Sequence, residues 1–484
     1  MISIHGAHEV ALAVIHAVEP PIVIFMLALN SFYALMLILS IPQLLRHWRI
    51  ADDANLRLLR AANVIPPLSI LVPAYNEEST IVASVLSYLS LEYPQHEVVV
   101  VNDGSTDATL QRLIETYDLV KVPAAYPTVI PTKPVHAFYR STVHAKLVCV
   151  DKVNGHKGDA LNAALNAARY PYVLAVDADT FIERDALLRL ARPFLLGQQV
   201  AAVGATIRIS NGSIVEHGRV VGAHVDSRWL PGIQTIEYLR AFLFGRLGWN
   251  RLGGGLIVSG AFGLFKQEHL HAIGGYNAGT VTEDLDLVVR LHKYLRAAGS
   301  ADIVTFVPDP VAWTEAPVTL KVLGAQRERW HRGLIATLVK HKNMMFNPRY
   351  GVIGLVAFPF YALGEMLAPV VEGLGYIVLL VSLALGAIDY RFAVAFLGVS
   401  MGYAFLLSLW AVALEEISFR RYSTKRDLLK LLWFSVIESF GYRQLTLWFR
   451  LCAFPRYLRG DMRWGVMTRE GPRAPAHRAT RTAT

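Results

Sequence analysis

The chain has 484 residues, of which 54% are hydrophobic and only 18% are charged, and its mean hydropathy is +0.37. This composition predicts membrane-spanning segments joined to a soluble part. The net charge of +9 gathers beside the apolar segments and in the tail, which favours an anionic membrane surface over nucleic acid as a partner. The two cysteines, Cys149 and Cys452, lie far apart and argue against a disulfide framework or a zinc site.

The first 20 residues contain three histidines and two glutamates among apolar residues: His5, His8, His16, Glu9 and Glu19. Metal binding by the histidines is one interpretation, but we expect a loosely ordered chain end. Residues 21–41 carry no charge and match the roughly 20 residues that span a bilayer. Because Arg46 and Arg49 follow directly, the positive-inside rule predicts an uncleaved transmembrane anchor over residues 21–45, with its amino end outside.

A cytoplasmic α/β domain is predicted over residues 50–316. Short apolar runs that begin near residues 68, 97, 145 and 172 end in polar loops, and helical patterns follow them. The stretch 122–135 contains four prolines and indicates an irregular connection. The alternation of strands and helices predicts a mostly parallel sheet of the nucleotide-binding type.

The strand predicted at residues 172–176 ends in two carboxylates, Asp177 and Asp179. Ligands of open α/β sheets bind beyond the carboxyl ends of the strands, which is where these side chains fall. A pair of carboxylates there suits Mg²⁺ or Mn²⁺, which keep their other positions for water and phosphate oxygens. Taken alone, the pair has an alternative interpretation as an Asx turn with solvated acids.

Seven short motifs follow one another between residues 68 and 335. They are residues 72–77 (VPAYNE), 102–107 (NDGSTD), 157–162 (KGDALN), 177–179 (DAD), 259–262 (SGAF), 282–284 (TED) and 326–330 (QRERW). In this order they resemble the motifs of family 2 glycosyltransferases with the GT-A fold. The last three resemble those of membrane-embedded processive synthases, the group of the poly-N-acetylglucosamine, chitin-oligosaccharide, hyaluronan and cellulose synthases. The resemblance implies an inverting hexosyltransferase that adds sugar from a UDP-sugar, favoured as UDP-N-acetylglucosamine, to a growing β-linked polysaccharide.

The resemblance also implies a donor site. Its expected residues are Pro73, Tyr75, Glu77, Asp103, Lys157, Asp177 and Arg329. Asp103 would accept a hydrogen bond from the uracil imide, although an aspartate of a β-turn is the alternative. Lys157 would neutralise a donor phosphate, although a solvated lysine at a helix start is the alternative. Asp159 lies where it can cap that helix, so we expect it to be structural.

Transfer needs a base that takes the proton of the attacking hydroxyl. Asp284, flanked by Glu283, fits this role because an acid beside a second acid is suited to accept a proton near neutral pH. The glycine-rich loop at residues 274–279 would let the backbone bring the acid to the acceptor. An acidic helix start favoured by the helix dipole is the alternative.

An acceptor site is implied by four residues: Ser259, Phe262, Gln326 and Trp330. Gln326, Arg329 and Trp330 share one helical face, where an amide, a cation and a ring can hold a polymer near the diphosphate. The surrounding segment, residues 317–350, also has the character of amphipathic helices at a membrane interface. The two interpretations are compatible.

A second membrane region is predicted over residues 351–453. Residues 351–387 are too long for one straight crossing, so we expect one crossing with a broken or interfacial remainder near Pro359 or Pro369. A second span follows at residues 392–414, and residues 431–453 lie along the interface, re-enter or cross. Glu365 and Glu372, inside the first stretch, line a sugar path or hold helices together.

The chain end, residues 454–484, is predicted to be a basic cytoplasmic tail that is partly disordered. Arg463 to Met467 resembles only faintly the gating loop of the family. The expected location is a bacterial inner membrane, and the expected partners are donor, polysaccharide acceptor, bilayer and secretion subunits, without nucleic acid. Two alternatives stay open: a single transfer to a lipid acceptor, and a non-catalytic subunit that binds nucleotide sugar.

Overall fold

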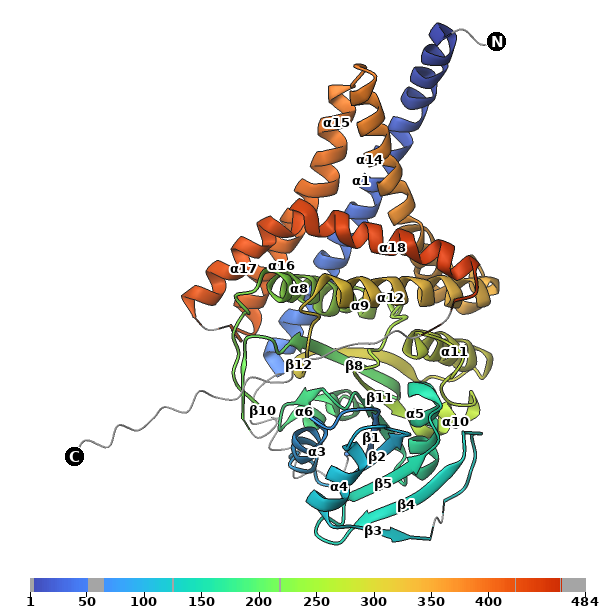
Figure 1. Cartoon of the computed structure of the whole chain (residues 1–484), viewed down its shortest axis with the longest axis vertical. Helices are drawn as coiled ribbons and strands as arrows, with labels where there is room; N and C mark the ends of the chain where they lie inside the picture. Colours follow the sequence, from blue (N-terminus) through green and yellow to red (C-terminus); the bar gives the residue numbers. More distant parts are fainter. Residues whose placement is uncertain are drawn as a thin grey trace, which may run out of the picture.

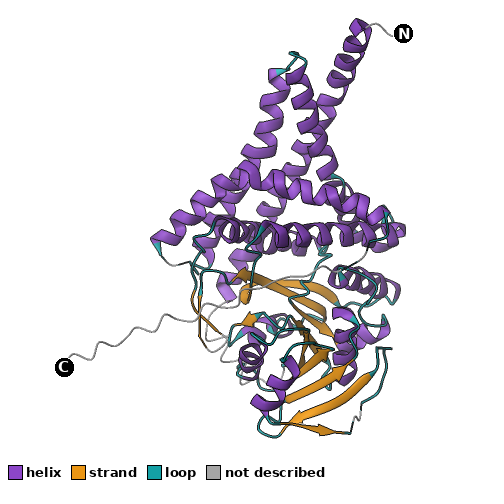
Figure 2. Cartoon of the chain, in the orientation of Figure 1, coloured by secondary structure: helices purple, strands orange, loops and turns teal. Residues whose placement is uncertain are grey.

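The computed structural model describes residues 4–50, 65–123, 126–216, 219–422, 424–461 and 463. A mixed α/β domain forms one end of the molecule, and long helices form the other (Figures 1 and 2). A layer of helices that run across the long axis lies between them (Figure 1). The tail beyond residue 463, with most of the faint gating-loop motif, lies outside the described residues.

The centre of the domain is a parallel four-stranded unit in the order β5-β2-β1-β6. Its strands are β1 (Leu68–Ala74), β2 (His96–Asp103), β5 (Leu147–Lys152) and β6 (Tyr172–Val176). They are almost completely buried runs rich in valine, isoleucine and leucine, as expected of parallel strands covered on both faces. Because they are parallel, their carboxyl ends meet at one edge of the sheet.

Further strands, joined mostly by antiparallel pairs, extend this unit on both sides to ten strands. They involve β3 (Leu119–Val122), β4 (Val135–Ser141), β7 (Phe181–Ile182), β8 (Val200–Ile209), β11 (Phe262–Lys266) and β12 (Ile303–Thr314). A separate hairpin joins β9 (Ile214–Glu216) and β10 (Arg219–Gly222). The prediction of a mostly parallel sheet therefore holds for the central strands and for the β8–β12 pair. It is wrong for the other flanking pairs, since β11, for example, runs antiparallel to both β6 and β8.

Helices cover both faces of the sheet. They are α3 (Ile81–Leu89), α4 (Thr109–Tyr117), α5 (His156–Ala167), α6 (Ala186–Leu190), α7 (Arg192–Leu195), α10 (Gln267–Ala272) and α11 (Glu283–Ala297). The apolar side chains of α3, α4 and α6 join one core cluster, and those of α5, α10 and α11 join another on the opposite face. The loops at the carboxyl edge stay accessible between these two layers.

The transverse layer, which we call the platform, consists of five helices: α8 (Trp229–Tyr238), α9 (Arg246–Leu252), α12 (Leu320–Lys340), α17 (Lys425–Ile437) and α18 (Arg443–Leu458). One π-helical turn, η1 (Leu239–Gly245), joins α8 to α9, and another, η7 (Glu438–Tyr442), joins α17 to α18. The second joint is a kink, because Gly441 has a φ of 87°. Helix α12 lies along α18, and two short 3-10 turns, η2 (Lys342–Met344) and η3 (Pro348–Tyr350), follow it.

Within the described residues, three helical stretches are long and apolar enough to cross a membrane: His8–His47, Ile353–Ala384 and Tyr390–Ser418. The first is α1 (Ile4–Ile50), so the expectation of a loosely ordered chain end is wrong from Ile4 onwards. The second contains η4 (Ile353–Ala357), α13 (Phe358–Phe360), η5 (Tyr361–Met366) and α14 (Ala368–Ala384). The third contains α15 (Tyr390–Leu397), η6 (Gly398–Tyr403) and α16 (Ala404–Ser418).

The two glutamates of the second stretch are paired with arginines of the platform. Glu365 accepts a hydrogen bond from Tyr33 (2.6 Å) and lies 3.3 Å from the Arg450 guanidinium. Glu372 lies 3.6 Å from the guanidinium of Arg443. These pairs connect α18 to the second stretch, which favours the interpretation that the glutamates hold helices together.

Candidate active site

The predicted donor residues gather at the carboxyl edge of the parallel strands. Asp103 is the last residue of β2, Asp177 follows β6, and Lys157 lies in the first turn of α5, directly after β5. β1 separates β2 from β6, so the loops after three neighbouring strands face one region. The strand order thus brings together residues that lie up to 74 positions apart in the chain, from Asp103 to Asp177.

Lys157 is the centre of a charged cluster. Its Nζ lies 2.6 Å from Asp177 Oδ1 and 3.1 Å from Glu283 Oε1, and it donates to the Gly260 carbonyl at 3.1 Å. Burial alone would lower the pKa of Lys157, but the carboxylates of Asp177 and Glu283 raise it well above its usual value. The ammonium therefore stays charged and holds three separate segments together.

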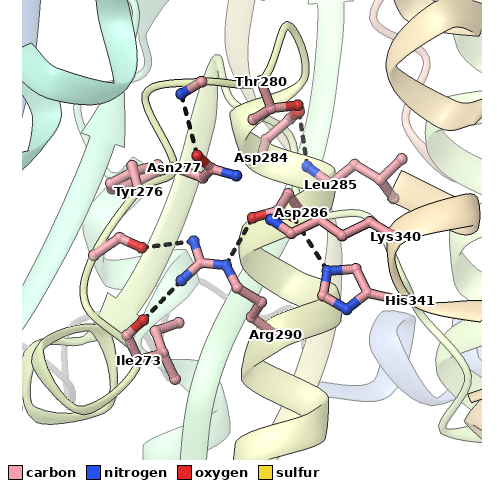
Figure 3. Close-up of polar contacts among 12 residues, drawn as sticks. Ile273, Tyr276, Asn277, Thr280, Asp284, Leu285, Asp286, Arg290, Lys340 and His341 are labelled. Atoms are coloured by element: carbon pink, nitrogen blue, oxygen red, sulfur yellow. Dashed lines mark hydrogen bonds and ion pairs between the residues drawn. The ribbon is translucent and has the colours of Figure 1, made fainter. Parts of the chain in front are cut away.

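Asp284 sits beside this cluster at the start of α11. Its Oδ2 accepts from the Gly260 backbone N–H (3.0 Å), and its Oδ1 accepts from the Leu285 N–H (2.9 Å), the latter drawn in Figure 3. Gly260 is close because β11 pairs antiparallel with β6, which places residues 259–262 next to Asp177. The carboxylate is thus fixed in orientation by two backbone donors.

Gly260 leaves little room for a side chain. A Cβ there would lie 3.2 Å from both Asp284 Oδ2 and Lys157 Nζ. We expect Gly260→Ala to displace both groups and to lower kcat by about tenfold, whereas Gly255→Ala, where no atom lies within 4 Å, leaves kcat unchanged. Steady-state kinetics of both variants test this, and an unimpaired Gly260→Ala enzyme would show that the contact does not position Asp284.

The glycine-rich loop at residues 274–279 is tied down rather than free. Arg290 of α11 donates to the carbonyls of Ile273 (2.8 Å) and Gly275 (2.6 Å), as Figure 3 shows. Asn162 of α5 clamps the backbone of Tyr276 with two hydrogen bonds. Gly275 is needed because its φ is +70° and a Cβ would meet Asn162 at 2.3 Å. The expectation of backbone freedom in this loop is therefore wrong.

Two residues after Asp284, Asp286 anchors helix α11 to the end of α12. Its carboxylate accepts from Arg290 (2.7 Å), Lys340 (2.8 Å) and His341 (3.2 Å) (Figure 3). Burial raises the pKa of Asp286, but the hydrogen bonds from His341 and Lys340 outweigh it and hold the pKa well below its usual range. Asp286 therefore joins α11 to the end of α12 as a permanent anion.

Helix α12 brings the predicted acceptor face to the site. Arg329 donates to the Val281 carbonyl (3.1 Å), and burial lowers its pKa while Glu283 and Asp284 oppose that shift. Gly333 allows the close approach, since a Cβ would lie 2.2 Å from the Thr282 side chain. Gln326 is buried, and the ring of Trp330 stacks against Arg327 at 4.6 Å.

Asp103 is held by a buried lysine that the sequence analysis did not identify. Lys152, the last residue of β5, lies 2.7 Å from Asp103 Oδ1 and 2.6 Å from Asp159 Oδ2. Gly155 N–H also donates to Asp103 Oδ1, so among the described residues Oδ2 is the oxygen left open to a ligand. Asp159 accepts from Lys152 and the Lys133 N–H, and it does not cap α5.

Because Lys152 separates two buried carboxylates, its removal should misplace Asp103. We expect Lys152→Met to raise the KM for the donor by about tenfold with a smaller change in kcat. Lys146→Met, which changes an exposed lysine just before β5, is the matched control. Equal KM values in the two variants would contradict the role of Lys152 in positioning Asp103.

The loop with Asp177 and Asp179 is preformed by Tyr88 of α3. The Tyr88 hydroxyl donates to the carbonyls of Asp177 (2.9 Å) and Thr180 (2.6 Å). Burial, and then the charges of Asp179 and Asp177, raise the pKa of Tyr88 well above its usual value, so it remains a donor. A fixed loop that presents the oxygen ligands of two carboxylates fits a hard divalent cation.

The other predicted site residues differ in accessibility. Tyr75 is 50% exposed, and its neighbours Pro73 and Glu77 are partly buried. Ser259, which precedes Gly260, is buried. Phe262 is 0% exposed and belongs to the hydrophobic core. The prediction that Phe262 contacts the acceptor is therefore wrong. The Phe262 side chain lies in the core and supports the loop at residues 259–262 from inside.

An arginine of the platform faces the same region and was also missed. The Arg246 guanidinium stacks on Phe242 (4.4 Å), and its Nη1 is buried without a hydrogen-bond partner among the described residues. Burial lowers the pKa of Arg246 to about 10, while Tyr361, Asp284 and Tyr238 oppose that shift. Tyr238, Phe242 and Arg246 recur every four residues, which is the sequence signal of one helical face.

Comparisons with known proteins agree with the arrangement. The family model described as glycosyltransferase-like family 2 matches residues 66–333. A poly-β-1,6-N-acetyl-D-glucosamine synthase of Staphylococcus epidermidis is 32% identical over 268 residues, covering 55% of this chain and 54% of that protein. The enzyme of the same name from Staphylococcus aureus is 29% identical over 269 residues, with the same coverage. The chain thus spans about half the length of the curated relatives it matches.

Among solved structures, the mannosyltransferase of Pyrobaculum calidifontis in complex with GDP-mannose and Mn²⁺ is similar at 19% identity with a TM-score of 0.49. The match covers 87% of this chain and 99% of that one.

Proposed function

The chain belongs to the glycosyltransferase-like family 2 with a GT-A-like mixed α/β fold, and on this premise we propose that it extends a β-linked polysaccharide from UDP-N-acetylglucosamine at a bacterial inner membrane. The observation that carries the proposal is the fixed Asp284 carboxylate beside the Lys157–Asp177 pair. The choice of sugar is supported by the name of the synthases from Staphylococcus that match residues of the same domain.

The proposed reaction is a single displacement with inversion. A hydroxyl oxygen of the acceptor sugar attacks C1 of the donor sugar, and Asp284 takes the hydroxyl proton. The bond between C1 and the diphosphate oxygen breaks, and the UDP leaves with the electron pair. Arg329 and Lys157 provide the positive charge that balances the leaving diphosphate, and Glu283 keeps Lys157 in place.

Asp177 and Asp179 are the proposed ligands of Mg²⁺ or Mn²⁺. The fit rests on two hard oxygen donors at the end of β6 and on the loop that Tyr88 holds. When bound, the cation supplies further positive charge for the leaving diphosphate. Asp103 would accept a hydrogen bond from the uracil imide N–H, and Pro73, Tyr75 and Glu77 would also contact the donor. The acceptor sugars would contact Ser259, Gln326 and Trp330.

The three long apolar stretches are the proposed membrane crossings. In this arrangement residues 50–316 form the cytoplasmic catalytic domain between them, residues 317–350 and the platform lie at the cytoplasmic interface, and residues 351–453 form the second membrane region. Arg46, Arg420 and Arg421 at the inner ends of the helices support this orientation.

The test is donor turnover by the full chain in detergent or nanodiscs. We expect UDP release from UDP-N-acetylglucosamine in the presence of Mn²⁺ to exceed release from UDP-glucose and UDP-glucuronate. A product with more than one added sugar supports polymer extension. A product with a single sugar on a lipid supports the alternative of a single transfer. If one donor binds and none turns over, a non-catalytic subunit is the better interpretation, and if none binds, the proposal is wrong.

A further inference from the structure

A cluster of metal-ligating side chains lies away from the glycosyltransferase domain. His16 and Glu19 of α1 meet Asp389, the residue that begins α15, and the three side chains offer ligand atoms that all lie within 4.8 Å of one another. Figure 1 shows the turn between α14 and α15 at the end of the bundle farthest from the sheet. The cluster therefore has no part in the chemistry proposed above.

The carboxylate of Glu19 needs a partner that the described residues do not supply. Its side chain is only 5% exposed, and neighbouring residues of α1, such as Ile15 and Ile22, belong to a hydrophobic cluster with residues of α14 and α15. Its Oε2 lies 3.1 Å from His16 Nδ1, but its Oε1 is buried without any hydrogen-bond partner among the described residues. A buried, half-satisfied carboxylate is costly unless a cation completes it.

Asp389 adds a second carboxylate to the same place. Its Oδ1 accepts the N–H groups of Arg391 (2.7 Å) and Phe392 (3.4 Å) and so caps α15. In the described part of the chain no lysine or arginine pairs with Glu19 or Asp389, so the two carboxylates repel each other. A comparable cluster, Glu268 with Asp302, is instead neutralised by Lys266 at 2.6 and 3.2 Å.

We propose that His16, Glu19 and Asp389 bind a divalent transition-metal ion, such as Zn²⁺, that clamps α1 to the start of α15. One imidazole and two carboxylates are a common ligand set of such ions, and the imidazole distinguishes them from Mg²⁺ and Ca²⁺. His16 is half exposed and lies beside Asp389, which stands in the turn between α14 and α15 at the outer end of these helices, so the ion can enter from the aqueous side and keep a water ligand. The ion satisfies the buried Glu19 oxygen and removes the repulsion between the carboxylates.

The test is metal binding by the full chain in detergent after treatment with a chelator. Zn²⁺ is titrated in excess Mg²⁺, which occupies the oxygen-only site at Asp177 and Asp179, and bound Zn²⁺ is counted by mass spectrometry after desalting. We expect about one Zn²⁺ per chain, and an affinity at least about tenfold lower in His16→Ala and Glu19→Gln. Co²⁺ in place of Zn²⁺ should give an absorption spectrum that the same variants lose.

Three further variants keep the result interpretable. Asp389→Asn loses the carboxylate but keeps an oxygen that caps α15, so it should fold and still bind Zn²⁺ poorly. His8→Ala and Glu9→Gln change exposed residues of the same helix and should bind as the unaltered chain does. Absence of Zn²⁺ binding, or equal binding by all variants, would overturn the proposal.

Discussion

Asp284→Asn should lower the turnover of the donor by about 10²–10⁴-fold while donor affinity changes little. Asparagine has the same shape, and its side-chain oxygen can still accept from the Gly260 N–H, so the local backbone should persist. The variant lacks a group that can take the proton of the acceptor hydroxyl. The measurements are UDP release under saturating donor and donor binding by calorimetry.

Asp286→Asn is the matched control for this prediction. Asp286 lies two residues further along α11, but its partners are Arg290, Lys340 and His341, and it faces away from the cluster around Lys157. Its substitution should lower stability and leave the kcat of the folded enzyme nearly intact. If Asp284→Asn loses donor binding and stability to the same extent as activity, its role is structural and another base is required.

The central sheet and the residues at its carboxyl edge could be predicted because their signals are local. Each parallel strand is a short, continuous apolar run, and the polar motif follows it directly in sequence. Strand order then brings the motifs together by a general rule of α/β sheets. On one flank, β3 and β4 were missed because they are partly exposed and lie beside the proline-rich connection.

Lys152 and Arg246 could not be predicted from their own neighbourhoods. Lys152 ends an apolar strand, and its two carboxylate partners come from β2 and α5, so only the register between β5 and β2 shows its role. Arg246 becomes relevant because α9 folds back over the site. In contrast, Phe262 sits inside a recognisable motif, but the pairing of β11 with β6 turns its side chain into the core. Strand pairing between distant segments sets the position of the Lys152 and Phe262 side chains, and the local sequence does not predict that pairing.

Helix α12 links the site to the long apolar helices. On one side Gly333 packs against Thr282 and Arg329 holds the Val281 carbonyl, directly before the Glu283–Asp284 pair. On the other side Glu328 pairs with Arg456 of α18 at 2.5 Å. Helix α18 in turn holds Glu365 through Arg450. The segment before Asp284 and the second apolar stretch are therefore linked through α12 and α18 by close packing, a backbone hydrogen bond and two ion pairs, so α12 contacts the candidate site on one side and the long apolar helices on the other.

Asp179→Asn should lower turnover by roughly 10²–10³-fold in saturating Mn²⁺, because one of the two proposed metal ligands is lost. Asp185→Asn is the control. Asp185 follows the same loop, but its carboxylate pairs with Arg189 at 2.6 Å, so its substitution should leave the Mn²⁺ requirement unchanged. Steady-state rates over a range of Mn²⁺ concentrations, with and without a chelator, provide the comparison.

The stronger form of this prediction concerns coupling between metal and nucleotide. Lys157 already pairs with Asp177 at 2.6 Å, so the Asp177–Asp179 pair should bind a free ion weakly. The diphosphate oxygens of UDP would complete the coordination of the ion, so UDP should raise the affinity for Mn²⁺. Thermodynamic linkage then requires Mn²⁺ to raise the affinity for UDP by the same factor, about 5–150-fold. We expect Asp179→Asn to abolish this coupling in calorimetry while UDP alone binds as before. Unchanged coupling in the variant would place the metal on other residues.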